Sequence, residues 1–192
     1  LANFGLQGEG VLPNGVSPSD LETAAKGMRS EAGVLDEDFL IVFAGRLLPE
    51  KGVMDLAAAV RELNDPAVRL VYAGSGDSST EGRLRAEPAV AFVGPLSHDR
   101  WLGLLLESDL LCLPTRYPEG LPTVILEAGL AGVPVVVSPA GGIPEVVEDG
   151  VSGRIVPAGD IAALTAAIRE LRMDPGRRSA LGAALRGRVR AG

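Results

Sequence analysis

The sequence predicts an α/β domain built on a doubly wound parallel sheet of the Rossmann-like type. Two observations support this prediction. Short apolar runs rich in Val, Leu and Ile alternate with segments whose apolar residues recur every three or four positions. Most of the short runs are apolar along their whole length, as strands are when helices cover both faces of a parallel sheet. A chain of 192 residues can form one sizeable core, so we expect a single domain over residues 1–192.

The elements follow from these patterns in chain order. Strands are expected at 40–44, 68–73, 90–93, 110–113, 133–137 and 154–156. Helices are expected at 53–63, 99–107, 122–131, 143–148 and 161–171, with a further helix after Pro175. Ser97 is a suitable N-cap, and Pro122 suits the first position of its helix. We expect a polar loop between Ala73 and Val90, and an entry strand, a helix and a connector within residues 1–38.

Composition restricts the classes of function. The chain is 46% hydrophobic and 22% charged, which is typical of a globular protein, and its net charge of -7 argues against nucleic acid as a partner. The single cysteine, Cys112, lies in an apolar run, so we expect a buried thiol. The sequence has no apolar stretch of membrane-spanning length and no signal-peptide pattern. Because the chain begins at Leu1, we expect it to be a fragment.

The first candidate site is the segment Gly45-Arg46-Leu47-Leu48-Pro49-Glu50-Lys51-Gly52, between a buried strand and a helix. Ligands of parallel sheets bind beyond the carboxyl ends of the strands, where the strand order reverses. Arg46, Lys51 and the helix N-terminus would place two cations and free backbone N–H groups there, which suits a diphosphate. The alternative is an ion pair of Arg46 or Lys51 with Glu50.

The second candidate site lies in Glu119-Gly120-Leu121-Pro122-Thr123-Val124-Ile125-Leu126-Glu127. Glu127 is surrounded by apolar helix residues and has no cation three or four positions away. A buried carboxylate needs hydrogen-bond donors. A ribose could supply them through its two hydroxyls. The alternative is a partner from another element of the fold, or exposure at the edge of the helix.

Two glycine-containing loops are weaker candidates. Gly74-Ser75-Gly76-Asp77 follows a strand and could allow close approach of a ligand, or simply form a turn. Gly141-Gly142 precedes a short helix and could form a ligand wall. His98 has no metal-ligand or triad partner at a suitable spacing, so we expect it to be a non-catalytic loop residue. The C-terminal arginines are expected to form a solvated helix face.

The order and spacing of these segments resemble the C-terminal domain of retaining glycosyltransferases with the GT-B fold, in the family 4 or group 1 set. The resemblance runs from Val11 to about Leu171. It is carried by the segments VLPNGV, FAGRLLPEKG, LVYAGSGD, VAFVGPLS, EGLPTVILE and AGVPVVVSPAGGIPEVVEDGVSGRIV.

The resemblance implies a role for each matching residue. Arg46 and Lys51 would hold the donor diphosphate and stabilise the departing nucleotide, beside Gly45. Glu127 would bind the ribose, and the segment from Val93 to Leu96 would lie near the base. Glu119 would contact the donor sugar as a catalytic residue, with Gly120, Leu121 and Thr123 facing sugar and phosphate. No metal or other cofactor is implied.

The family also implies partners for this chain. Its members have an N-terminal acceptor-binding domain, which is absent here, so we expect the fragment alone to bind a UDP- or GDP-linked sugar and transfer little. The implied setting is a bacterial cytoplasm, with contact to the inner face of the membrane as a further expectation. One departure from the family pattern is Leu121-Pro122 in place of Phe-Gly, which removes one backbone N–H from the site.

Three alternatives change the function, and the first of them keeps the fold. They are a GT-B sugar epimerase or phosphorylase-like enzyme, a non-catalytic nucleotide-binding module, and an NAD-linked oxidoreductase. The oxidoreductase would require GxGxxG with an acidic residue about 20 positions on. The segment from Gly74 to Ser79 does not match that pattern.

Overall fold

The computed structural model describes residues 17–117 and 120–191. Within these residues lies a six-stranded parallel sheet with the strand order β3-β2-β1-β4-β5-β6. The strands are β1 (Phe39–Ala44), β2 (Val68–Ala73), β3 (Val90–Gly94), β4 (Leu110–Leu113), β5 (Val135–Val137) and β6 (Arg154–Ile155). The doubly wound sheet predicted from the sequence is therefore confirmed, with its order reversing between β1 and β4.

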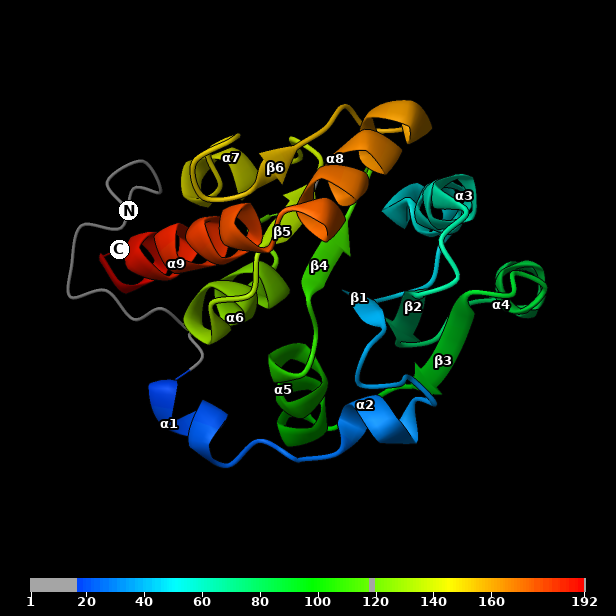
Figure 1. The fold of residues 1–192 in the computed structure, drawn as a ribbon, viewed down its shortest axis with the longest axis horizontal. Helices are drawn as coiled ribbons and strands as arrows, with labels where there is room; N and C mark the ends of the chain where they lie inside the picture. Colours follow the sequence, from blue (N-terminus) through cyan, green and yellow to red (C-terminus); the bar gives the residue numbers. More distant parts are fainter. Residues whose placement is uncertain (1–16, 118–119, 192) are drawn as a thin grey trace.

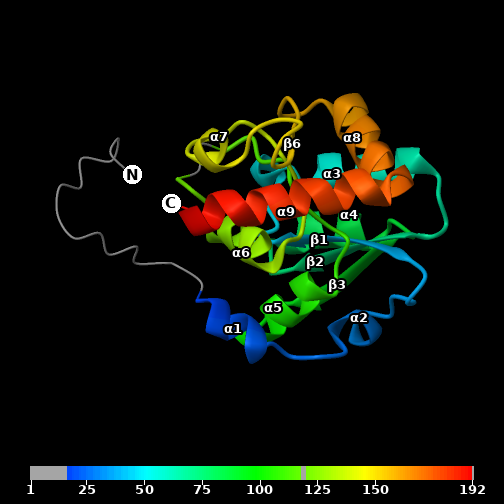
Figure 2. The ribbon, with the colours of Figure 1, turned by 60° about the vertical axis from the view of Figure 1, so that its left-hand side comes forward.

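Helices cover both faces of the sheet (Figure 1). One side carries α3 (Val53–Leu63), α4 (Ser78–Arg85) and α8 (Ile161–Met173). The other carries α5 (His98–Leu106), α6 (Thr123–Ala131) and α9 (Pro175–Ala191), and Figure 2 shows α9 running along α6. The shorter helical elements are α1 (Pro18–Glu22), α2 (Met28–Glu31), α7 (Ile143–Val146) and the 3-10 helix η2 (Pro49–Lys51).

The core explains why the two central strands are apolar throughout. Both central strands, β1 and β4, are buried along their length except for the half-buried Ala44. Tyr72 is buried in β2, where its hydroxyl donates a 2.6 Å hydrogen bond to the carbonyl of Val53. Burial raises the pKa of Tyr72 well above its usual value. The hydroxyl therefore remains a donor that ties α3 to the sheet.

Three details of the expected elements need correction. The segment between β2 and β3 is not a loop, because it contains α4, whose N-cap Asp77 accepts the backbone N–H of Thr80. Pro122 is the N-cap of α6 rather than its first helical residue. His98 is the first residue of α5 and not a loop residue, with Ser97 as the N-cap. Of the entry strand, helix and connector expected within residues 1–38, residues 17–38 contain the helices α1 and α2 and no strand, and residues 1–16 lie outside the described part of the chain.

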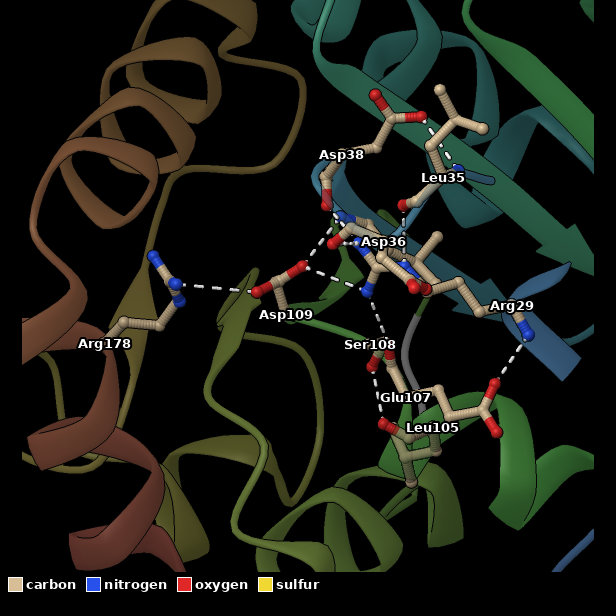
Figure 3. Close-up of polar contacts among 10 residues, drawn as sticks. Arg29, Leu35, Asp36, Asp38, Leu105, Glu107, Ser108, Asp109 and Arg178 are labelled. Atoms are coloured by element: carbon tan, nitrogen blue, oxygen red, sulfur yellow. Dashed lines mark hydrogen bonds and ion pairs between the residues drawn. The ribbon is translucent and has the colours of Figure 1, made fainter. Parts of the chain in front are cut away.

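A polar network at the amino ends of β1 and β4 fixes the segment before the sheet (Figure 3). Asp109 accepts the backbone N–H of Leu40 at 2.9 Å and forms ion pairs with Arg29 and Arg178. The guanidinium of Arg29 also donates to the carbonyls of Leu35, Asp36, Asp38 and Glu107. This basal network joins α2, the central strands and α9.

The C-terminal arginines form the solvated helix face expected from the sequence only in part, because Arg186, Arg188 and Arg190 are exposed whereas Arg177 and Arg178 are half-buried. Four of them donate to carbonyl oxygens of the fold, where they hold α9 in place. Their acceptors are Gly150 for Arg177, Leu171 for Arg178, Ala131 for Arg186 and Val146 for Arg188.

Candidate functional site

The candidate site lies beyond the carboxyl ends of β1 and β2, beside the point where the strand order reverses. Gly45 and Arg46 follow β1 directly, and the backbone continues to pair with the segment after β2 through a bridge between Leu47 and Gly76. Both Gly45 and Arg46 are exposed. This is the edge of a doubly wound sheet at which ligands bind.

Two adjoining pockets open at this edge. The larger, here the α5 pocket, has a volume of about 480 Å³ and is lined by Ala44, Gly45, Arg46, Ala73, Gly74, Ser75, Pro95, Leu96, His98 and Trp101. The smaller, here the α6 pocket, has a volume of about 190 Å³ and is lined by Phe43, Ala44, Gly45, Arg46, Lys51, Leu113, Pro122, Thr123 and Val124. Arg46 lines both pockets, so its side chain could contact a ligand that extends from one pocket into the other.

Arg46 and Lys51 converge as predicted from the sequence, because both line the α6 pocket. Within residues 17–117 and 120–191, the Arg46 side chain has no ion-pair partner, so its pairing with Glu50 is not seen. The ammonium of Lys51 lies 4.9 Å from the ring centroid of Tyr117, in cation–π contact. Tyr117 therefore helps to hold Lys51 at the pocket, a contact that sequence reasoning missed.

The route of the chain brings Lys51 to this position. Gly52 has a left-handed backbone conformation (φ 73°) and ends η2 immediately before α3. A β-carbon on Gly52 would lie 2.1 Å from the carbonyl oxygen of Pro114. Only glycine therefore allows the turn after Lys51 to pack against the segment that follows β4.

Glu127 is buried, and its partners come from another element of the fold. Its Oε2 accepts the indole N–H of Trp101 at 2.5 Å, and its Oε1 lies 3.3 Å from Nε2 of His98. Trp101 and His98 lie three residues apart on the face of α5 that meets α6. Sequence reasoning left these partners unidentified, although the i, i+3 spacing of His98 and Trp101 is a signal that could have found them.

The glycines after β2 allow two chain segments to pack closely, and Gly74 also lines the α5 pocket. A β-carbon on Gly74 would lie 1.9 Å from the carbonyl oxygen of Gly45, and one on Gly76 would lie 2.2 Å from that of Leu47. The close approach expected at Gly74-Ser75-Gly76-Asp77 is therefore between two chain segments. Gly142 is buried, and its N–H donates to the carbonyl of Gly120.

Some of the remaining predicted site residues line a pocket and others do not. Leu96 lines the α5 pocket and Thr123 lines the α6 pocket. Val93 is a half-buried residue of β3 that lines neither pocket. Gly120 and Leu121 lie in the loop before α6 and also line neither. Glu119 lies outside the described residues.

Among the described residues, no group of three His, Cys, Asp or Glu side chains is placed to hold a metal ion. Across residues 17–117 and 120–191, none of the helices combines the length and the apolar character needed to cross a lipid bilayer.

A doubly wound sheet with two cations at its switch point is typical of domains that bind the phosphates of nucleotides. The profile of the family "Glycosyl transferases group 1" matches residues 26–188. The chain therefore belongs to the group 1 glycosyl transferases, as the sequence motifs indicated.

Relatives and solved structures agree with this assignment. The chain is 36% identical to the glycogen synthase of Mycobacterium tuberculosis over 173 residues, covering 86% of this chain and 40% of that protein. It is 34% identical to a GDP-mannose-dependent phosphatidylinositol monomannoside mannosyltransferase of Corynebacterium glutamicum, covering 94% and 51%. The chain thus spans about half the length of the curated relatives it matches.

Two solved structures are also similar to this chain. Anabaena HepE, solved with UDP and glucose, superposes with a TM-score of 0.75 at 28% identity, covering 93% of this chain and 49% of that one. Sucrose-phosphate synthase from Thermosynechococcus elongatus also has a TM-score of 0.75, at 27% identity, covering 89% and 46%.

Proposed function

We propose that this chain is the donor-binding half of a retaining glycosyltransferase, which transfers a sugar from a nucleoside-diphosphate sugar to an acceptor. The observation that carries the proposal is the convergence of Arg46 and Lys51 on a pocket at the switch point of the sheet. Family membership and the UDP held by the similar HepE structure support it. The acceptor-binding half would come from the part of the relatives' length that this chain does not span.

In this proposal the diphosphate lies across the junction of the two pockets. Arg46 lines both pockets and can donate several hydrogen bonds to phosphate oxygens, while Lys51 supplies a second positive charge. As the bond from the sugar to the diphosphate breaks, negative charge accumulates on the leaving phosphate. Two fixed cations stabilise that charge, which lowers the barrier without a bound metal.

The nucleoside would occupy the α5 pocket. Its base would lie against Leu96, while the ribose would reach towards Glu127 behind His98 and Trp101. Val93 would help to shape β3 beside the base and would not contact the base itself. Gly120, Leu121 and Thr123 would face the donor sugar, on the side of the α6 pocket, where Thr123 is a lining residue. Glu119 would contact the donor sugar, as the resemblance to the family implies.

A nucleotide panel tests this assignment. The chain would be titrated with UDP, GDP, ADP, CMP and NAD while its thermal unfolding is followed. A ligand at about 100 times its dissociation constant adds roughly 2.7 kcal/mol of stability. For a chain of this size, that corresponds to an increase in Tm of about 5–10 °C. We expect one nucleoside diphosphate to produce this shift in the wild type and to lose it in Arg46→Ala and Glu127→Ala.

The matched control is Arg83→Ala, which removes an exposed arginine of α4 away from both pockets and should retain the shift. No shift with any nucleotide would contradict the donor site. A shift with NAD alone would favour an oxidoreductase. Binding without acceptor-dependent transfer by the full-length enzyme would favour an epimerase or a non-catalytic module.

The cellular location is also a proposal. A nucleotide-sugar donor is a cytoplasmic metabolite, and a cytoplasmic enzyme is the setting we propose. A lipid contact through the C-terminal arginines is not favoured, because four of them are already bound to carbonyl oxygens of the fold.

A further inference from the structure

The contact between Trp101 and Glu127 is the polar feature beside the α5 pocket that the proposed donor site does not explain. Each of these residues is only 6% exposed. An indole N–H can only donate, and a buried one needs an acceptor. A carboxylate shielded from water likewise needs donors. The 2.5 Å hydrogen bond from Nε1 to Oε2 satisfies both groups at once.

This hydrogen bond also sets the orientation of the carboxylate. Trp101 is held by the buried face of α5, and Glu127 by the buried face of α6. With Oε2 occupied by the indole, Oε1 remains as the oxygen directed at His98. The two oxygens of Glu127 therefore have different surroundings, one held by the buried indole of Trp101 and one facing the half-exposed imidazole of His98.

His98 differs from Trp101 in exposure. Its side chain is 53% exposed and lines the α5 pocket, whereas Glu127 does not. The imidazole therefore separates Oε1 from the pocket. Its 3.3 Å contact is longer than the indole hydrogen bond, and a half-exposed side chain can move without opening the core. A ligand hydroxyl could replace it at Oε1.

We propose that Trp101 is a positioning residue that fixes the Glu127 carboxylate, and that a ribose hydroxyl displaces His98 from Oε1 when a nucleotide enters. This rests on the proposed function, in which Glu127 faces the ribose. Trp101 acts through Glu127 and makes no contact with the hydroxyl itself. His98 is the exchangeable partner, which keeps the carboxylate satisfied while the pocket holds no nucleotide.

The test compares UDP and GDP with their 2′,3′-dideoxy forms, by calorimetry on the full chain. The wild type should prefer the ribonucleotide by about tenfold or more, the loss expected for one charge-assisted hydrogen bond. Trp101→Phe keeps an aromatic ring but removes the donor. It should reduce this preference by at least about fivefold and leave affinity for the dideoxy form within about twofold.

A double-mutant cycle separates positioning from packing. In a Glu127→Ala background, Trp101→Phe should change the ribose preference no further. If Trp101→Phe retains the wild-type preference, or weakens both nucleotides equally, the positioning role is overturned. A wild type that binds neither nucleotide overturns the proposed function itself, so the two failures are distinguishable.

His98→Ala provides a second test that leaves the core intact. Because the ribose displaces His98 in this proposal, His98→Ala should leave the affinity for the ribonucleotide unchanged or raise it by a few fold. The affinity for the dideoxy form should not change. A loss confined to the ribonucleotide would show that His98 is a direct ribose ligand and overturn its displacement. This readout remains usable if Trp101→Phe fails to fold.

Discussion

Gly74 faces Gly45 so closely that a β-carbon on Gly74 would lie 1.9 Å from the Gly45 carbonyl oxygen. Both residues have a backbone φ of 141°, which side chains disfavour. Gly74→Ala should therefore destabilise the chain by about 3 kcal/mol or more, measured by urea unfolding.

Gly82→Ala is the matched control for this substitution. Gly82 lies within α4, and a β-carbon there would meet no heavy atom within 4 Å. Alanine is the better helix former, so a gain of about 0.5–1 kcal/mol is expected. Equal stability of the two variants would contradict the close approach of the strand ends.

The basal network should support stability without affecting the pockets. Asp109→Ala leaves the buried N–H of Leu40 without its acceptor and removes the ion-pair partner of Arg178. A loss of about 2–3 kcal/mol in unfolding free energy is expected. Nucleotide affinity, measured by calorimetry, should stay within about twofold because the network lies at the opposite edge of the sheet. Asp36→Ala, which removes an exposed carboxylate nearby, serves as the control.

Asp77 gives the chain a pH-dependent element of stability. Its hydrogen bonds from the Thr80 side chain and backbone lower the pKa of Asp77 below its usual value. A carboxyl whose pKa is lowered by folding stabilises the native state above its unfolded pKa, about 4 for aspartate. This contribution is lost as the pH falls through the lowered value.

Asp77→Asn keeps a capping side chain without the charge. The stability difference between wild type and Asp77→Asn should therefore be constant near neutral pH and should shrink below about pH 4. Thermal unfolding from pH 7 downwards measures it. A difference that stays constant at acid pH would argue against an ionised cap.

The proposed diphosphate site predicts how affinity depends on phosphate number. The wild type should bind a nucleoside weakly and gain affinity with each added phosphate, while Arg46→Ala should lose about tenfold or more of that gain. Arg83→Ala should behave as the wild type. Calorimetry with uridine, UMP and UDP, or the guanosine series, provides the comparison. An unchanged phosphate gain in Arg46→Ala would remove Arg46 from the site.

Cys112 should be inert in the native state. It is fully buried in β4, and burial raises the pKa of its thiol far above the usual value. A thiol reagent should leave the folded chain unmodified and label it once per chain after unfolding in guanidinium. Labelling of the folded chain at the rate of the unfolded one would contradict this burial.

The sequence predicted the scaffold well because periodicity and burial act locally. The helix at 53–63 and the strands at 68–73 and 110–113 have the bounds that were expected. The helix α4 was missed because its residues, Ser78–Arg85, are polar and present only a small buried face at Thr80 and Leu84. A helix that is stabilised mainly by its N-cap has few apolar residues at helical spacing, so its sequence shows little periodicity.

The candidate site was predicted less completely, for a physical reason. Arg46 and Lys51 lie near one another in the chain, so their convergence could be inferred from one loop. The contacts of Glu127 with Trp101 and His98 join helices whose packing no local pattern specifies. Tyr117 beside Lys51 is likewise a contact between separate segments, the loop after β4 and the end of η2. The roles of Glu119 and the other sugar-facing residues stay predictions.

The basal network lies at the amino ends of the strands and the candidate pockets lie at their carboxyl ends, and this separation has a consequence for engineering. The polar contacts of Arg29, Asp109 and Arg178 anchor one edge, and the candidate pockets open at the other. Pro95 and Leu96, which line the α5 pocket, could then be diversified in a library to select a new base preference while the anchored edge is left as it is. The scaffold would tolerate such a library because the positions that vary are not those that hold it together.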